Sequence, residues 1–194
     1  MVHPISSRTI LWIGGGALLV GALVVIVALG FYPIALVNST PVFSYQYDKG
    51  YRLAYNYYSF LNKASQQPLA ETELRSRLRV AVLEGLIDEV FVDTKLKREM
   101  THSELEAKIR SQVGELIADT EFHKNLASIL KVSDDDIRSY FLEDQVKYQI
   151  LEGQLRLEGV KDLTEWVVQQ RRKARVQLFL EGARWNGDEV VFGT

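Results

Sequence analysis

The 194-residue chain contains no cysteine, which excludes a disulfide framework, a thiol nucleophile and a cysteine metal site. Histidine is scarce as well, with only His3, His102 and His123, which are far apart in the sequence. The net charge is −2 at pH 7, so no basic field indicates a nucleic-acid partner. The composition therefore predicts a protein with no metal, no other cofactor and no nucleic acid bound.

Catalytic motifs are also missing. The sequence has no nucleophile elbow, no zinc-protease helix motif, no phosphate-binding loop and no dinucleotide fingerprint. Three consecutive aspartates, residues 134–136, could hold calcium, but the glycine and closing glutamate of a calcium loop are absent. Ser133 before them is a typical helix N-cap, with the acids in the first helical turn. We therefore expect no enzymatic activity. A deep pocket with convergent carboxylates would restore the enzyme alternative.

Charge is absent from one long stretch, residues 9–37. The apolar run of residues 10–29 rises roughly 30 Å as a helix, the hydrocarbon thickness of a bilayer. We predict a transmembrane anchor, with a cleaved signal peptide as the alternative, although the run exceeds the usual length of such a peptide. Arg8 precedes the run and the next charge is Asp48, so the positive-inside rule places residues 1–8 in the cytoplasm. The remainder is predicted to be extracytoplasmic.

The rest of the chain has mostly helical periodicity. Patterns of apolar residues and caps predict helices over residues 48–64, 71–98, 101–117, 120–130, 133–158 and 164–173. The second of these helices has the clearest apolar stripe. The sequence Thr-His-Ser-Glu, which starts at Thr101, predicts a capping box with Glu104.

Alternating residues indicate strands at both ends of this helical region. Residues 175–181 alternate, and Asn186–Gly187 predicts a hairpin turn before a returning strand. Since a lone hairpin is marginal in water, we expect residues 37–44 to provide a third strand. A small antiparallel sheet would then join the N-terminal and C-terminal ends of the domain.

Aromatic residues are concentrated directly after the apolar run, where six of the nine tyrosines lie between Tyr45 and Tyr58. Most of these tyrosines fall in the helix predicted over residues 48–64. This helix is apolar on two sides, so it must be covered on two sides. One face can build the core and the other can bind clients, or both can be structural. We predict these client- or partner-binding residues: Tyr51, Tyr55, Tyr57, Tyr58, Phe60, Tyr140 and Phe141.

The order of these elements resembles the N-terminal chaperone domain of the SurA, PpiD and PrsA group of extracytoplasmic folding factors. The likeness covers about residues 36–158. It rests on Val-Asn-x-x-x-Val at residues 37–42, the long helix that contains Leu-Arg-Val-Ala-Val-Leu-Glu-Gly, the capped helix after Thr101, and Val-Ser-Asp-Asp-Asp-Ile at residues 132–137. Relatives usually insert a parvulin-type isomerase domain before the C-terminal segment. Here residues 158–164 leave no room for one.

The resemblance implies a mainly α fold: a transmembrane helix, a SurA-like helical domain and a small antiparallel sheet. The expected organisation is residues 1–8 cytoplasmic, 9–37 anchor, 38–158 chaperone-like domain, and 159–194 a C-terminal helix and hairpin. The implied function is an anchored holdase that binds unfolded exported polypeptides without isomerase activity. The resemblance leaves a homodimer open as the oligomeric state. The alternative is a structural subunit that docks one dedicated partner of an envelope or secretion assembly.

Overall fold

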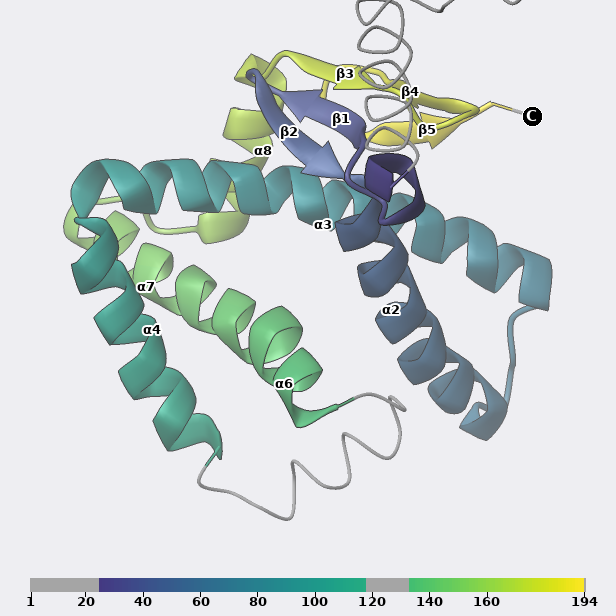
Figure 1. The fold of residues 1–194 in the computed structure, drawn as a ribbon, viewed down its shortest axis with the longest axis horizontal. Coiled ribbons are helices and arrows are strands. Elements are labelled where there is room, and N and C mark those ends of the chain that lie inside the picture. Colours follow the sequence, from purple (N-terminus) through teal and green to yellow (C-terminus); the bar gives the residue numbers. More distant parts are fainter. Residues whose placement is uncertain (1–24, 118–132, 194) are drawn as a thin grey trace, which may run out of the picture.

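The computed structural model describes residues 25–117 and 133–193 and is mainly helical, with two small antiparallel sheets (Figure 1). This confirms the predicted mainly α fold with a small sheet. The elements, in chain order, are β1 (Pro33–Val37), β2 (Thr40–Phe43), α2 (Ser44–Ala64), α3 (Glu71–Glu99), α4 (His102–Ile117), α6 (Asp134–Ile137), η1 (Arg138–Leu142), α7 (Glu143–Leu157), α8 (Leu163–Lys173), β3 (Val176–Leu178), β4 (Ala183–Trp185) and β5 (Val190–Phe192).

The long helix α3 crosses the molecule, with α2 at one end and α4 and α7 at the other (Figure 1). At 29 residues it is about 43 Å long, and its buried side chains recur at helical spacing. The first residue of this buried set is Leu74 and the last is Leu96. The helix contacts α2, α4, α7, α8 and both sheets, so it is the element that connects most of the others.

The larger sheet has the order β2-β1-β3, so β1 is its central strand. Ala35 lies opposite Val42 on one side and opposite Leu178 on the other, which confirms that N-terminal and C-terminal strands pair. The predicted third strand over residues 37–44 is wrong in its bounds. Asn38 and Ser39 both have positive φ, as in the tight turns of two-residue hairpins, and they split that stretch into parts of β1 and β2.

The predicted anchor cannot extend to residue 37, because Pro33–Val37 is a strand of the domain. Ile34, Ala35 and Val37 are buried in the core under the sheet. Within residues 25–117 and 133–193, no helix is long and apolar enough to cross a bilayer. Most of the predicted span, residues 10–24, lies outside the described residues.

The C-terminal hairpin is formed by β4 and β5 around the predicted Asn186–Gly187 turn. The amide of Asn186 donates to the carbonyl of Glu189 across 3.2 Å, and Gly187 has a φ of +120°. The predicted first arm, the alternating stretch at residues 175–181, instead supplies β3, which pairs with β1. The alternation correctly indicated a strand, but it carries no information about the pairing partner.

Three of the predicted helices have their predicted ends within a residue or two: α3, α4 and α8. The capping box at the start of α4 is confirmed, since the Thr101 amide donates to the Glu104 carboxylate and the Glu104 amide to the Thr101 hydroxyl. The Ser133 cap is confirmed by a bond from the Asp136 amide to its hydroxyl. The helix predicted over residues 120–130 falls outside the described residues.

Two helix predictions need correction. α2 begins at Ser44, four residues earlier than predicted, because the Gln46 side chain accepts a hydrogen bond from the Phe43 amide and so caps the first turn. The single helix predicted over residues 133–158 contains a π-helical turn, η1. Such turns occur mostly as short insertions in α-helices, and the apolar periodicity of a sequence does not reveal them.

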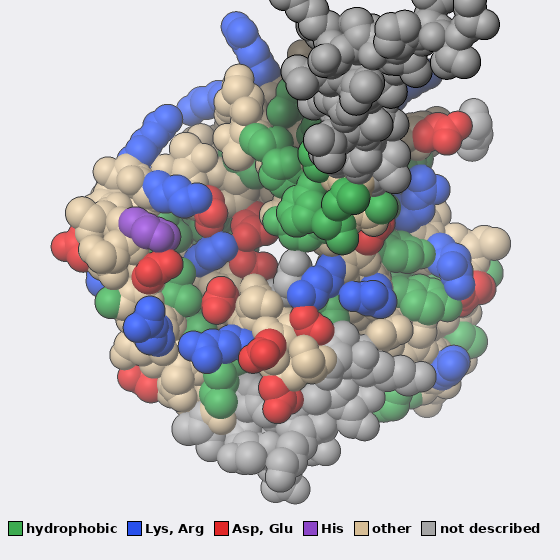
Figure 2. All heavy atoms as spheres, viewed as in Figure 1, with side chains coloured by type: hydrophobic (Ala, Val, Ile, Leu, Met, Phe, Trp, Pro, Cys, Tyr) green, Lys and Arg blue, Asp and Glu red, His purple; other side chains and the backbone are tan. Residues whose placement is uncertain are grey.

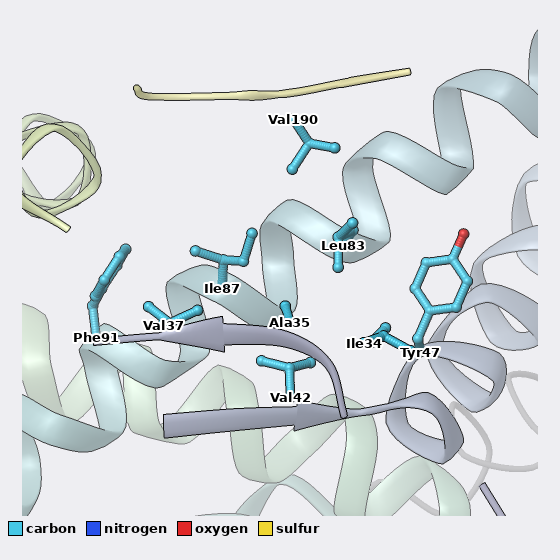
Figure 3. Close-up of a cluster of buried hydrophobic side chains, with 9 residues drawn as sticks. All are labelled: Ile34, Ala35, Val37, Val42, Tyr47, Leu83, Ile87, Phe91 and Val190. Atoms are coloured by element: carbon cyan, nitrogen blue, oxygen red, sulfur yellow. The ribbon is translucent and has the colours of Figure 1, made fainter. Parts of the chain in front are cut away.

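The hydrophobic core has three parts. The first lies between the larger sheet, β5 and α3, where Leu83, Ile87 and Phe91 meet Val37 and Val190 (Figure 3). The second joins Leu53 of α2 to α4, α6 and α7. The third packs α3, α4 and α7 together around Leu96 and Leu151. The second part fixes α2 against the α7 side of the molecule.

α8 is attached to α3 by the partly buried Trp166, which packs against the core, and by an ion-pair cluster. The guanidinium of Arg171 donates to both carboxylate oxygens of Asp88 at 2.7 and 2.6 Å and to Glu84 at 3.2 Å. The other oxygen of Glu84 accepts from the amide of Val190 in β5 at 2.9 Å. One arginine thus joins the C-terminal helix and hairpin to the central helix.

Candidate functional site

A groove of about 330 Å³ opens where α2, α3 and α7 meet. Its lining is largely apolar and comes from these residues: Gln46, Gly50, Leu53, Ala54, Tyr57, Tyr58, Val82, Gly85, Leu86, Glu89, Asp144 and Tyr148. Another, larger hollow of about 460 Å³, lined by Thr40, Leu86, Lys97 and Arg98 among others, is more polar. Of these two hollows, the apolar groove is the one that fits the aromatic pattern of the sequence.

Two glycines shape this groove in opposite ways. A Cβ added at Gly50 would lie 3.2 Å from Cγ1 of Val82, so Gly50 allows α2 and α3 to approach closely. A Cβ added at Gly85 would meet nothing within 4 Å, so the space above Gly85 is part of the open groove. Gly50 therefore forms the closed edge, and Gly85 keeps the groove unfilled.

Two of the predicted binding residues, Tyr51 and Tyr55, do not line the groove. With Tyr47 they form a stack along one face of α2, with ring centroids 6.2 Å apart at each step. The hydroxyl of Tyr55 donates to the Glu71 carboxylate, and the Arg75 guanidinium lies 4.7 Å from the centre of the Tyr55 ring. Through Tyr55 this face contacts α3, which agrees with the structural alternative for these tyrosines.

Tyr57 and Tyr58, two others of the predicted client-binding residues, line the groove. Their rings meet edge to face with centroids 5.3 Å apart, a favoured geometry for aromatic pairs. Tyr57 also packs against the core around Leu53, whereas 48% of Tyr58 is exposed. The pair therefore combines a fixed ring with an accessible one.

The other predicted residues lie apart from the groove or cannot be placed. Phe60 is exposed near the end of α2 and is not among the groove residues. Tyr140 and Phe141 belong to η1, but their side chains are outside the described part of the structure. Their role in binding stays a prediction.

One end of the groove is acidic. Lys147 lies 2.9 Å from Glu89, 3.2 Å from Asp93 and 3.3 Å from Asp144, while Asp93 also pairs with Lys97. Burial, reinforced by the negative charge of Glu89 and opposed by Lys147, raises the pKa of Asp144 to about 7. Burial and the nearby carboxylates also raise the pKa of Tyr148.

The sequence did not predict this cluster, because Lys147 and Glu89 are 58 residues apart. The i,i+3 spacing of Asp144 and Lys147 is the only local signal, and many exposed helices have the same spacing. In the described ranges, no group of three or more acids or histidines is arranged to hold a metal ion. The ammonium of Lys147 already lies between the three carboxylates.

Comparison of the chain with protein-family models, curated proteins and solved structures gives no match. The resemblance to the SurA, PpiD and PrsA group therefore stays a prediction from the sequence pattern.

Proposed function

We propose that the protein is a membrane-anchored, extracytoplasmic holdase whose groove binds apolar segments of unfolded exported polypeptides. The observation that carries this proposal is the open, largely apolar groove between α2, α3 and α7, with Tyr57 and Tyr58 in its lining. Soluble proteins rarely leave an apolar hollow uncovered without a ligand or partner for it.

The size of the groove favours short segments. About 330 Å³ is at the lower end of the range for ligand pockets, which suits one or two large side chains of a client rather than a whole helix. Each Å² of apolar client surface removed from water contributes about 25 cal/mol before the cost of ordering the client. We therefore expect weak and rapidly reversible binding, which suits a holdase.

The membrane location rests on the sequence. The uncharged residues before β1 provide the anchor, and the single charge that precedes them, Arg8, orients it with the N-terminus in the cytoplasm. Because β1 belongs to the domain, the anchor ends before Pro33 and the domain begins there rather than at residue 38.

We further infer that the protein acts without prolyl isomerase activity. α7 ends at Leu157 and α8 begins at Leu163, so the position where proteins of the SurA, PpiD and PrsA group carry a parvulin domain holds only a short connection. Client binding would then depend on the groove alone.

The test uses the full chain in lipid nanodiscs and guanidinium-unfolded, reduced lysozyme diluted into buffer. Light scattering follows aggregation across a titration of the protein. Gly85→Leu should fill the groove and remove the suppression of aggregation, because Gly85 lines the groove and a Cβ there meets nothing within 4 Å. Gly153→Leu is the matched control, since Gly153 also sits in a helix with nothing within 4 Å but lies outside the groove.

Suppression by the wild type and by Gly153→Leu, lost in a folded Gly85→Leu variant, is the expected result. If the wild type gives no suppression at several-fold molar excess, the holdase proposal is wrong. Saturable one-to-one binding to a single envelope protein, without competition from unfolded lysozyme, would instead favour the dedicated-partner alternative.

A further inference from the structure

A second apolar surface lies at the opposite end of α2 from Phe60. Val27, Leu29, Phe31, Tyr32 and Tyr45 expose between 36% and 58% of their surface, and we call these five residues the collar. Figure 2 shows the hydrophobic side chains gathered there in one patch, over the segment that precedes β1 and the start of α2. The rings of Phe31 and Tyr45 have centroids 5.1 Å apart, so the patch is continuous across the two elements.

The collar is fixed to the domain by a glycine cap. Residues 25–28 are helical, and this helix ends at Gly30, whose φ is +72°. The amide of Phe31 donates to the carbonyl of Ile26, and the amide of Gly30 donates to that of Val27. This pair of bonds is the usual way to satisfy the last carbonyls of a helix with a glycine in the left-handed conformation.

The same glycine contacts the domain directly. The amide of Tyr45 donates to the carbonyl of Gly30 at 3.1 Å, and the amide of Ser44 to that of Tyr32 at 3.0 Å. A Cβ on Gly30 would lie 3.0 Å from the backbone nitrogen of Tyr45, so only glycine fits without displacement. The apolar segment therefore enters the sheet and α2 through ordered backbone contacts, without a loose linker.

The position of the collar along the chain indicates what covers it. The uncharged run that starts at residue 9 continues into the collar, and the first charges after it, Asp48, Lys49 and Arg52, lie on the next two turns of α2. Aromatic residues at the end of an apolar span, followed by charged residues, are typical of the layer where a bilayer meets water. A lipid surface matches this order of residues.

We propose that the collar lies in the interfacial layer of the bilayer and holds the domain against the membrane in one orientation. α2 then runs away from the lipid surface, and Tyr57 lies about 18 Å further along the helix than Tyr45. The client groove would face the aqueous side at a fixed height. This inference rests on the membrane anchor of the proposed function, but it does not require that the groove binds clients.

The absence of native cysteine allows a direct depth measurement on the full chain. Single Tyr45→Cys and Phe31→Cys variants, labelled with a nitroxide, would be reconstituted in phosphatidylcholine–phosphatidylglycerol liposomes. Gln67→Cys is the control, because Gln67 is exposed in the loop about 30 Å along α2 from the collar. Power-saturation EPR then compares the accessibility of each label to oxygen and to a water-soluble nickel chelate.

We expect both collar labels to be more accessible to oxygen than to nickel, and the Gln67→Cys label to show the reverse. Collar labels that behave like the Gln67→Cys label would overturn the proposal. So would dipolar broadening that disappears on dilution with unlabelled protein, since it would show that a second copy of the chain covers the collar. The use of two collar positions keeps the test valid if one variant fails to fold.

Discussion

The tyrosines of α2 fall on two faces of the helix, and the face decides whether a client can reach them. Tyr51 and Tyr55 are held in a stack with contacts to α3, so their truncation would weaken the packing of α2. Tyr57 and Tyr58 line the groove, where one ring is fixed by the core and the other is accessible. Only the second pair has the position that client binding requires.

At the acidic end of the groove, Asp144 should make stability depend on pH. Its pKa is raised from the ordinary value of 3.8 to about 7, so between these values the folded protein binds more protons than the unfolded chain. The free energy of unfolding therefore falls as pH rises through this window. Asp144→Asn cannot ionise and should lose this part of the slope in urea titrations at pH 4.5, 5.5, 6.5 and 7.5.

The charged groups that face Asp144 come from two helices: Glu89 from α3 and Lys147 from α7, with Tyr148 beside them. Glu152→Gln on the same helix, whose carboxylate pairs with Arg156 and not with the Asp144 cluster, is the matched control and should keep the wild-type slope. An unchanged slope in Asp144→Asn would show that the carboxylate ionises normally in the folded protein.

At the scale of elements, the two glycines at the α2–α3 contact should respond oppositely to alanine. Gly85→Ala should raise the free energy of unfolding by about 0.5–1 kcal/mol, because alanine favours the helix and meets no neighbour. Gly50→Ala should lower it by about 1 kcal/mol, because the added Cβ would lie 3.2 Å from Val82 Cγ1 and Val82 must shift in a packed contact. Urea midpoints of the two variants provide the measurement, and equal gains in both would contradict the packing described for Gly50.

Helix positions could be predicted from the sequence because their signals are local. The apolar stripe of α3, the Thr101–Glu104 box and the Ser133 cap each involve residues within a few positions of one another. The strand pairing was only partly predictable. The alternation in Val176–Leu178 indicates a strand, but its partner β1 is about 140 residues away and lay inside the predicted anchor.

The groove was predicted only in outline. The number of tyrosines indicated an aromatic surface, but the choice between its two faces depends on where α3 and α7 pack. The stripe of Tyr51 and Tyr55 is as regular as that of any core helix, and here Tyr55 contacts Glu71 of α3. The acidic cluster requires side chains from α3 and α7 together, so no single segment of sequence could reveal it.

For the whole molecule, the central position of β1 sets the minimum folding unit. A chain that begins at residue 38 lacks β1, which lies between β2 and β3 and buries Ile34, Ala35 and Val37. We expect this truncated chain to lose cooperative thermal unfolding. A chain that begins at residue 31 should keep it. Circular dichroism melts of the two fragments test this, and a cooperative melt of the shorter one would show that the sheet is dispensable.

The proposed membrane surface and the proposed client surface are formed by different residues, although Gln46 of the groove directly follows Tyr45 of the collar. The collar lies at the start of α2, and the groove continues along α2 toward its other end, bounded by α3 and α7. The core around Leu53 connects α2 to α6 and α7, and Lys49 of α2 pairs with Asp136 of α6. The molecule thus holds the groove walls together independently of any client.

Site-specific crosslinking is the most direct test of client binding in the groove. A Tyr58→Cys variant of the full chain in nanodiscs, labelled with benzophenone maleimide, would be irradiated with unfolded, reduced lysozyme. Gln169→Cys on α8 is the control, because it is exposed and not among the groove residues. The proposed function predicts a strong lysozyme adduct from Tyr58→Cys that Gly85→Leu abolishes, and little adduct from Gln169→Cys. Equal adducts from both positions would contradict a client site in the groove.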